Sequence, residues 1–147
     1  MTVKTDEFYV DKPVEDLYIQ DITREVDRSV ARSNVANGIV TIFVGCSTAS
    51  ISTMKHEPRS VEEMRSLLEM LAPSGIEYAH HTSTGDIHGT GNDNNGKSHI
   101  RSAILGPSIT VPLKDGKLTL DEDQDIVLLD FDIIKRKRKI VVQIMGE

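Results

Sequence analysis

The chain has 147 residues, of which 38% are hydrophobic and 27% are charged, a composition typical of a globular domain and not of a disordered segment. Its formal net charge of -6 at pH 7 argues against general nucleic-acid binding, which needs a broad basic surface. The apolar runs are far too short to span a bilayer, and residues 1–10 lack the pattern of a secretory signal. We therefore expect neither a membrane partner nor secretion.

The first third of the chain predicts a strand, a helix and a second strand. Residues 3–10 alternate loosely between polar and apolar, as a strand does. Apolar residues at four-residue steps then predict an amphipathic helix: Ile22, Val26 and Val30. Asn37 and Gly38 stop this helix or turn the chain. The β-branched run GIVTIFV, residues 38–44, predicts a well-buried strand.

The segment GCSTAS, residues 45–50, follows this strand and brings hydroxyls and a thiol to a strand end, where sites commonly lie. Cys46 is the single cysteine, which excludes an internal disulfide and suits a reducing cytoplasm. The favoured interpretation of Cys46 is a small buried apolar residue, because no adjacent motif activates it as a nucleophile.

A second helix is predicted after residue 59. Ser60 and Glu63 have the spacing of a capping box. Apolar residues follow at three- and four-residue steps and predict a stripe facing the core: Val61, Met64, Leu67, Leu68 and Leu71. Pro73 marks the end of the helix.

The C-terminal half consists of short apolar runs separated by polar turns. The runs are SITVPL, KLTL, IVLLDFD and KIVVQIM. Asp115 and Gly116 form a hairpin signal, because this pair tolerates the positive φ angles of a tight turn. The basic run KRKRK, residues 135–139, is interpreted as a solvated turn. No helix is predicted between these strands, so we expect an antiparallel meander within one α+β domain spanning residues 1–147.

Residues 77–102 form a glycine- and asparagine-rich segment with four of the five histidines: His80, His81, His88 and His99. It is either a solvated loop or a metal or phosphate site. An EF-hand is excluded, because a loop starting at Asp86 places Gly91 sixth but Lys97 twelfth, where a carboxylate belongs. If residues 98–105 begin as a strand, His99 and Arg101 point to one face and together make a pocket for an anion.

Several segments resemble, in order, the YjbQ-type family, whose members are often labelled secondary thiamine-phosphate synthases. The segments are GIVTIFVGCSTAS, EP, YAHH, NGKSHIRSAILGPSITVPLKDGKL and KIVVQIMGE. The resemblance runs from about residue 10 to residue 147, and its most specific block is NG-x-S-H-x-R-x-x-x-L-G-P-S-x-x-V-P. It implies an α+β fold with two main helices and a mostly antiparallel sheet, assembled as a homotrimer with its site near the subunit boundaries.

The resemblance also assigns residues to the site. His80 and His99 become its histidines and, with Cys46, candidate ligands of a divalent metal, zinc or magnesium. Many members carry a histidine where Cys46 stands, so either its thiolate replaces an imidazole or the metal has fewer protein ligands. The expected catalytic residues are His80, His99 and Arg101. The expected substrate-binding residues are Ser47, Thr48, Asn95, Gly96, Arg101, Ser108 and Gln124. Gly106 is expected to help frame the same site.

The activity implied by the resemblance joins a pyrimidine methyl pyrophosphate to a thiazole phosphate and releases pyrophosphate. The expected ligand is therefore a phosphorylated small molecule, and the expected compartment is the cytoplasm. Three features depart from the family: DEDQ replaces a GTWQ motif and keeps only Gln124, the segment 86–95 is longer and adds His88, and Lys55 stands where an acid is usual. A metal- or phosphate-binding trimer without turnover is the alternative.

Overall fold

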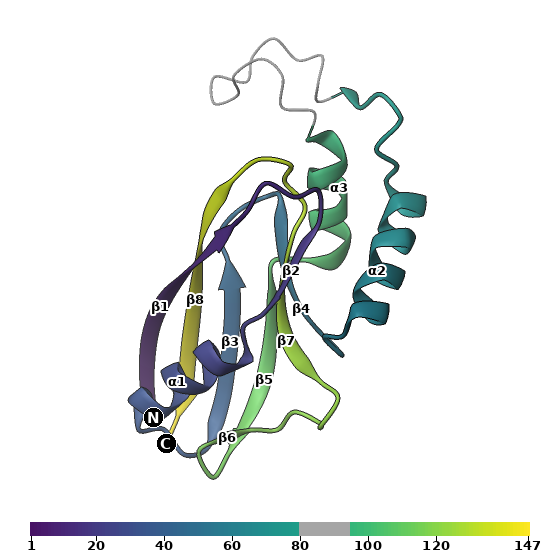
Figure 1. Ribbon diagram of the computed structural model, residues 1–147. Coiled ribbons are helices and arrows are strands. Elements are labelled where there is room, and N and C mark those ends of the chain that lie inside the picture. The colour runs from purple at the N-terminus through teal and green to yellow at the C-terminus, as the bar shows by residue number, and fades with distance from the viewer. Residues whose placement is uncertain (80–94) are drawn as a thin grey trace.

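The computed structural model describes residues 1–79 and 95–147, which form two β-sheets and three helices (Figure 1). In chain order the elements are β1 (Thr2–Lys12), β2 (Tyr18–Asp21), α1 (Thr23–Ser33), β3 (Gly38–Val44), β4 (Ala49–Met54), α2 (Pro58–Leu71), α3 (Gly96–Leu105), β5 (Ser108–Lys114), β6 (Lys117–Leu118), β7 (Asp125–Asp130) and β8 (Arg136–Gly146). None of these helices combines the length and the apolar character needed to cross a bilayer.

Every strand pairing among the described residues is antiparallel. One sheet has the order β1-β8-β3-β5-β6 and the other the order β2-β7-β4. The expectation of an α+β fold on a mostly antiparallel sheet is confirmed. The expected C-terminal meander is wrong, because β7 crosses to the small sheet and β8 returns between β1 and β3.

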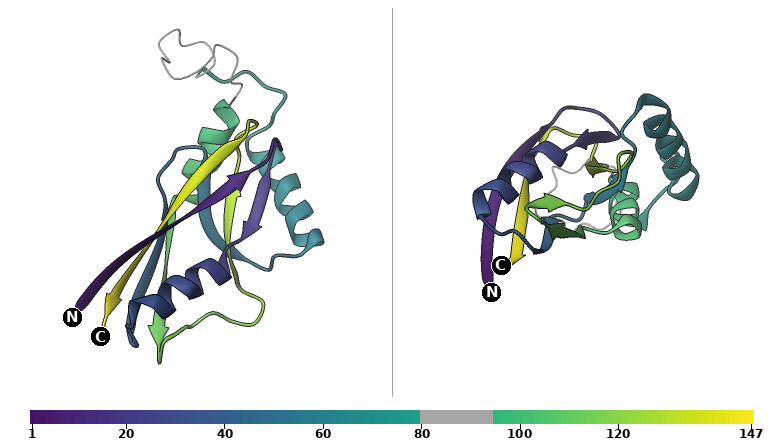
Figure 2. Two further views of the ribbon diagram at one scale, coloured as in Figure 1. Left: turned by 60° about the vertical axis from the view of Figure 1, so that its left-hand side comes forward. Right: turned by 90° about the horizontal axis from the view of Figure 1, so that it is seen from below.

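The hydrophobic core has two parts, one on each face of the small sheet. The larger part lies between the two sheets and α1, and it contains Val10, Ile22, Val26, Val30, Val35, Val40, Ile42, Val44, Ala49, Ile51, Val111, Leu113, Ile126, Leu128, Ile140, Val142 and Ile144. The smaller part lies between the small sheet and α2, and it contains Leu17, Ile19, Leu68, Val127, Leu129 and Phe131. β7 is therefore buried on both faces, which explains its continuous run IVLL. Figures 1 and 2 show α2 and α3 on the side of the molecule away from β1.

The predicted elements of the first third are present. α1 begins at Thr23, whose main-chain N donates to Asp21 Oδ1 at 2.9 Å, and ends at Ser33, because Asn34 adopts a left-handed φ of 58°. Asn37 and Gly38 therefore turn the chain into β3 and do not stop the helix. β3 has the predicted bounds, but it is buried on one face only.

The helix predicted after residue 59 is present as α2, but two details differ. It begins at Pro58, which suits the first helical position, so the predicted capping box at Ser60 is wrong. Only Leu68 of the predicted apolar stripe is buried, whereas Leu67 and Leu71 are 49% and 54% exposed. Val61 and Met64 pack partly against the smaller core.

The third helix corrects the expectation of a strand at residues 98–105. α3 presents a polar side to the protein, with Ser98, Arg101 and Ser102 buried. Its apolar residues Ile100 and Ile104 are 45% and 55% exposed. Because the buried side is polar, the usual hydrophobic signal of a helix is missing.

The hairpin predicted at Asp115 and Gly116 is confirmed. These residues have φ angles of 50° and 74°, and they join β5 to β6 in a register that pairs Lys114 with Lys117. This is the geometry of a two-residue turn with positive φ at both positions.

Candidate functional site

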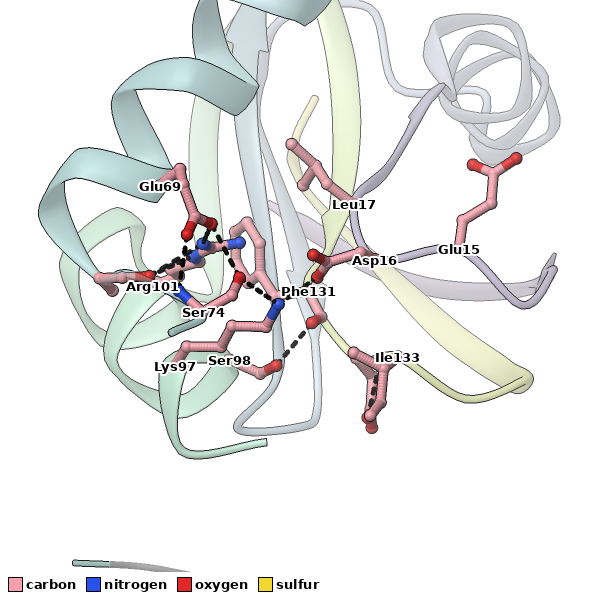
Figure 3. Close-up of polar contacts among 12 residues, drawn as sticks. Glu15, Asp16, Leu17, Glu69, Ser74, Lys97, Ser98, Arg101, Phe131 and Ile133 are labelled. Atoms are coloured by element: carbon pink, nitrogen blue, oxygen red, sulfur yellow. Dashed lines mark hydrogen bonds and ion pairs between the residues drawn. The ribbon is translucent and has the colours of Figure 1, made fainter. Parts of the chain in front are cut away.

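Three segments that are distant in sequence meet at one end of the small sheet: the first turns of α3, the β3–β4 turn and the β7–β8 loop. Ser98 Oγ donates to the carbonyl oxygen of Phe131 at 2.5 Å (Figure 3). The main-chain N of Phe131 donates to the carbonyl oxygen of Thr48 at 3.0 Å. Asp132 then accepts a long hydrogen bond of 3.5 Å from Thr48 Oγ1. The expected site residue Thr48 and the helix that follows the expected residue Asn95 therefore both contact the short segment at Phe131.

Arg138 and Asp130 form the central ion pair of this region. Arg138 Nε donates to Asp130 Oδ2 at 2.5 Å and its Nη2 to Asp130 Oδ1 at 3.0 Å, while Nη2 also donates to Thr48 Oγ1 at 2.8 Å. Asp130 is fully buried. Burial alone would lower the pKa of Arg138, but Asp130, with smaller contributions from Cys46 and Asp132, raises it above its ordinary value. The guanidinium therefore stays charged although it is buried.

A second arginine of the basic run binds the second buried carboxylate. Arg136 Nε donates to Asp132 Oδ2 at 2.8 Å, and Asp132 is 0% exposed. The interpretation of residues 135–139 as a solvated turn is therefore wrong, because residues 136–139 begin β8 and Arg138 is buried. Lys135 remains exposed, as interpreted.

Lys12 adds a third cation to this region. Its side chain is fully buried, and Nζ donates to the carbonyl oxygens of Pro13, Glu15 and Ile134 at 2.9, 2.6 and 3.1 Å. Burial lowers the pKa of Lys12, and the nearby carboxylates of Asp130 and Asp132 oppose that shift. Lys12 therefore ties the β1–β2 loop to the β7–β8 loop.

We call these residues the strand-end cluster: Lys12, Thr48, Asp130, Asp132, Arg136 and Arg138. It gathers three cationic groups around the carboxylates of Asp130 and Asp132, and Glu15 near Lys12 adds a third carboxylate. Sequence reasoning named only Thr48. The sequence does indicate the burial of Arg138. The buried residues Ile140, Val142 and Ile144 alternate along β8, and the same alternation continued two residues towards the N-terminus places Arg138 on the core face.

The N-terminus of α3 contains a buried amide without a partner. Asn95 is the residue before the helix, is 8% exposed and makes no side-chain cap. Its Oδ1 is buried and accepts no hydrogen bond from any part of the chain that the structure describes. A buried carbonyl oxygen of this kind is costly unless a donor reaches it. Gly96, which follows, is also buried.

Lys97, which sequence reasoning did not assign to the site, lies beside Asn95. It is 6% exposed, and Nζ contacts Asp16 Oδ1 at 2.6 Å and Ser74 Oγ at 2.8 Å (Figure 3). Asp16 therefore balances its charge. His99, two residues further along the helix, is partly buried.

Arg101 does not share a face with His99. Residues two positions apart on an α-helix lie about 200° apart around its axis. Because residues 98–105 are helical, the prediction that His99 and Arg101 together make an anion pocket is wrong. Arg101 is 2% exposed and contacts Glu69 Oε2 at 2.9 Å and the carbonyl oxygen of Ala72 at 2.8 Å (Figure 3). It therefore joins α3 to the C-terminus of α2, where a cation is favourable.

The other expected substrate-binding residues are spread over the chain. Ser47 is exposed in the β3–β4 turn, close in sequence to Thr48, whereas Ser108 is exposed at the start of β5. Gln124 precedes β7 and donates through Nε2 to Thr53 Oγ1 at 3.3 Å. It is separated from Asp130 by the length of β7, roughly 20 Å, so one chain does not bring it to the strand-end cluster.

The metal ligands expected from the family resemblance are only partly within the described residues. His80, His81 and His88 lie outside them. Cys46 is a free thiol, partly buried against the larger core. Residues 1–79 and 95–147 contain no group of three histidine, cysteine or acidic side chains placed to hold a metal ion. These residues alone therefore do not fit a metal centre.

Comparison with known proteins places this architecture in a family. Residues 9–147 match the family model described as UPF0047 protein YjbQ-like. A UPF0047 protein of Methanothermobacter thermautotrophicus is 33% identical over 127 residues, which cover 86% of this chain and 82% of the relative. A UPF0047 protein of Archaeoglobus fulgidus is 31% identical over 123 residues, which cover 84% of this chain and 88% of the relative.

Solved structures show the same fold. A crystal structure from Sulfolobus solfataricus, described as a YbjQ-like protein of unknown function, has a TM-score of 0.89 with 29% identity and covers 99% of both chains. A hypothetical protein from Aeropyrum pernix has a TM-score of 0.84 with 26% identity over 98% of this chain and 99% of its own. By sequence and by fold, this chain belongs to the YjbQ-like UPF0047 protein family.

Proposed function

We propose that this protein binds a phosphate-bearing small molecule where the strand-end cluster meets the N-terminus of α3. One observation carries the proposal: the cluster gathers three cationic groups in an acidic chain, and one of them, Arg136, reaches solvent. A ligand can reach the cluster at Arg136, because the Arg136 side chain is 38% exposed. The Asp132 carboxylate that Arg136 contacts is 0% exposed. A guanidinium suits phosphate, because its planar N–H groups match two oxygens at once.

Polar groups beside the cluster support the same ligand. Ser47 is exposed in the adjoining turn and offers a hydroxyl donor. The buried Oδ1 of Asn95 lacks a donor among the described residues, and an N–H or O–H group of a ligand would satisfy it. A ligand with both an anionic group and a hydrogen-bond donor matches these features.

The reaction we propose as the specific activity is that of a thiamine-phosphate synthase, with a pyrimidine methyl pyrophosphate and a thiazole phosphate as substrates. A cationic site would stabilise the pyrophosphate that leaves. In this proposal His80 and His99 act at the reacting centre, and a divalent metal, zinc or magnesium, shares them with Cys46. The proposal rests on the family resemblance together with the charge of the strand-end cluster.

Binding without turnover is a second candidate, and one observation favours it. Arg101, expected among the catalytic residues, is engaged by Glu69 and Ala72 and is almost completely buried. Incubating the protein with both precursors and magnesium separates the two functions. Turnover that is lost in His99→Ala supports the enzyme, whereas phosphate binding without product supports the binder. A protein that binds neither precursor nor pyrophosphate would contradict both.

We also propose that the chain assembles as a homotrimer. The five-stranded sheet has an outer face that no other described element covers, and apolar side chains on it are exposed. Ile39 and Phe43 on β3 are 43% and 41% exposed, and Val3 and Tyr9 on β1 are 53% and 57% exposed. A second copy of the chain on this face would bury them.

A further inference from the structure

Lys97, in the first turn of α3, forms an ion pair whose two partners are very unequally buried. Lys97 Nζ lies 2.6 Å from Asp16 Oδ1, and the two side chains are 7% and 48% exposed (Figure 3). A lysine is seldom buried without a partner, because its ammonium loses its hydration there. The protein therefore needs an anion at this position, and the position is open to solvent on the side of Asp16.

A second contact holds the Lys97 ammonium in place without Asp16. Nζ also donates to Ser74 Oγ at 2.8 Å. Ser74 is fixed in turn by Glu69, which accepts hydrogen bonds from the main-chain N and from Oγ of Ser74 at 2.7 and 2.8 Å (Figure 3). Arg101 binds Glu69 from the other side. The ammonium would therefore stay where it is if the Asp16 carboxylate moved away.

The Asp16 side chain depends on this one contact. In the part of the chain that the structure describes, Lys97 is its only polar partner. The loop on either side of Asp16 is anchored separately, because Lys12 Nζ donates to the carbonyl oxygen of Glu15 at 2.6 Å and Leu17 is buried in the smaller core. Rotation about the side-chain bonds of Asp16 therefore releases Lys97 without moving the loop.

The charges around Lys97 balance only while Asp16 is in contact. The described residues form two ion pairs here, Lys97 with Asp16 and Arg101 with Glu69, so two cations meet two carboxylates. The side chain of Glu15, the neighbouring acid of the loop, points away from Lys97 (Figure 3). When Asp16 turns to solvent, the buried ammonium is left without a counter-charge, which favours the capture of another anion.

The donors at this position suit a carboxylate better than a phosphate. The hydroxyl hydrogen of Ser74 is given to Glu69, so Lys97 meets a ligand as a point charge without help from Ser74. A phosphate presents three acceptor oxygens, whereas the position already accommodates the carboxylate of Asp16. We propose that this position binds the carboxylate of a small-molecule ligand, and that Asp16 is an internal competitor that occupies it when the ligand is absent. The strand-end cluster contains neither Lys97 nor Asp16, so the two sites are separate.

The experiment is an NMR titration of the full chain with acetate at constant ionic strength, followed at the main-chain amides of α3. Asp16→Ala vacates the position, and Asp16→Asn removes the charge but keeps the size of the side chain. We expect the wild type to bind acetate and both variants to bind it more tightly, Asp16→Ala by about tenfold or more, because the internal competitor is gone. Lys97→Met should not bind acetate. Glu15→Gln is the matched control, because it removes a carboxylate of the same loop that does not contact Lys97, and it should change the affinity by less than about twofold.

Asp16 variants that bind acetate no more tightly than the wild type would overturn the proposal, as would a wild type that does not bind acetate. An equal gain in Glu15→Gln would also overturn it, because acetate would then respond to the overall charge of the loop. Failure of both Asp16 variants to fold would show that Asp16 is a fixed structural partner of Lys97 and would reject the exchange. A wild type that binds pyrophosphate but not acetate would reject this site and retain the proposed function, whereas the reverse result would retain this site alone.

Discussion

Arg138 holds Asp130 through two hydrogen bonds, from Nε to Oδ2 at 2.5 Å and from Nη2 to Oδ1 at 3.0 Å. The carboxylate is 0% exposed and the arginine 8% exposed, so neither partner can exchange this contact for water. Removing one member of a buried pair costs more than the pair contributes, because the other charge is left without a partner. This pair is the centre of the strand-end cluster, and it orients Thr48 as well.

The first prediction follows from this pair. Replacing Arg138 by Met should lower the free energy of unfolding by about 3–5 kcal/mol, because Asp130 would be left charged and buried. Replacing Arg136, whose side chain is 38% exposed, should cost less, since water can reach Asp132 from that side. Urea denaturation of the two variants measures the difference, and a loss in Arg138→Met no larger than the loss in Arg136→Met would contradict the predicted order.

The second prediction concerns Arg101, which the sequence placed in a ligand pocket. Because Arg101 joins α3 to Glu69 and to the carbonyl oxygen of Ala72, Arg101→Ala should destabilise the fold by about 1–3 kcal/mol. His99→Ala should change stability by less, because the His99 side chain is only partly buried. Thermal unfolding of both variants tests this order, and an unchanged melting temperature in Arg101→Ala would refute the structural role.

A pH dependence is expected from Glu69. The amide of Ser74, then its hydroxyl and Arg101, hold the pKa of Glu69 below its ordinary value of 4.5. A carboxyl group with a lowered folded-state pKa stabilises the fold above its unfolded pKa, and this contribution is lost as the pH falls through the folded pKa. Because the side chain is 48% exposed, the contribution is at most about 1 kcal/mol.

Glu69→Gln provides the measurement of this effect. It should unfold at a lower urea concentration than the wild type at neutral pH, and the difference should shrink as the pH falls below the ordinary value of 4.5 and through the lowered folded-state pKa of Glu69. A difference that stays constant over this pH range would show that the charge of Glu69 does not contribute.

The fourth prediction is the oligomeric state. Sedimentation should give a particle of about 49 kDa, three times the chain mass of 16.3 kDa, because assembly would cover the outer face of the five-stranded sheet. Ile39→Glu should dissociate it by placing a charge on that face. Leu67→Glu is the control, since Leu67 is similarly exposed but lies on α2. A wild-type monomer at micromolar concentration would contradict the proposal.

The sequence predicted those elements whose burial follows a simple period. β3 and the Asp115–Gly116 hairpin were recovered with their bounds, because alternation and turn chemistry are local signals. α3 was missed because its buried side is made of Ser98, Arg101 and Ser102, so hydrophobic periodicity does not reveal it.

The candidate site was predictable only in part, for a different reason. The spacing of residues shows which face a side chain takes, but not its partner on a distant segment. Arg138 contacts Thr48 across 90 positions, and no local pattern indicates that pairing. Gln124 was expected at the site from the family resemblance, but within one chain the length of β7 separates it from the strand-end cluster.

The central claim is that the strand-end cluster provides the positive charge that holds a phosphate-bearing ligand. Titration calorimetry with pyrophosphate on wild type, Arg136→Met and Lys135→Met tests it most directly, because the two variants remove one positive charge each from neighbouring positions. We expect Arg136→Met to weaken pyrophosphate by about 10- to 150-fold, as for the loss of a charge-assisted hydrogen bond, and Lys135→Met to bind like the wild type. Equal affinities for all three proteins, or no binding by the wild type, would contradict the account.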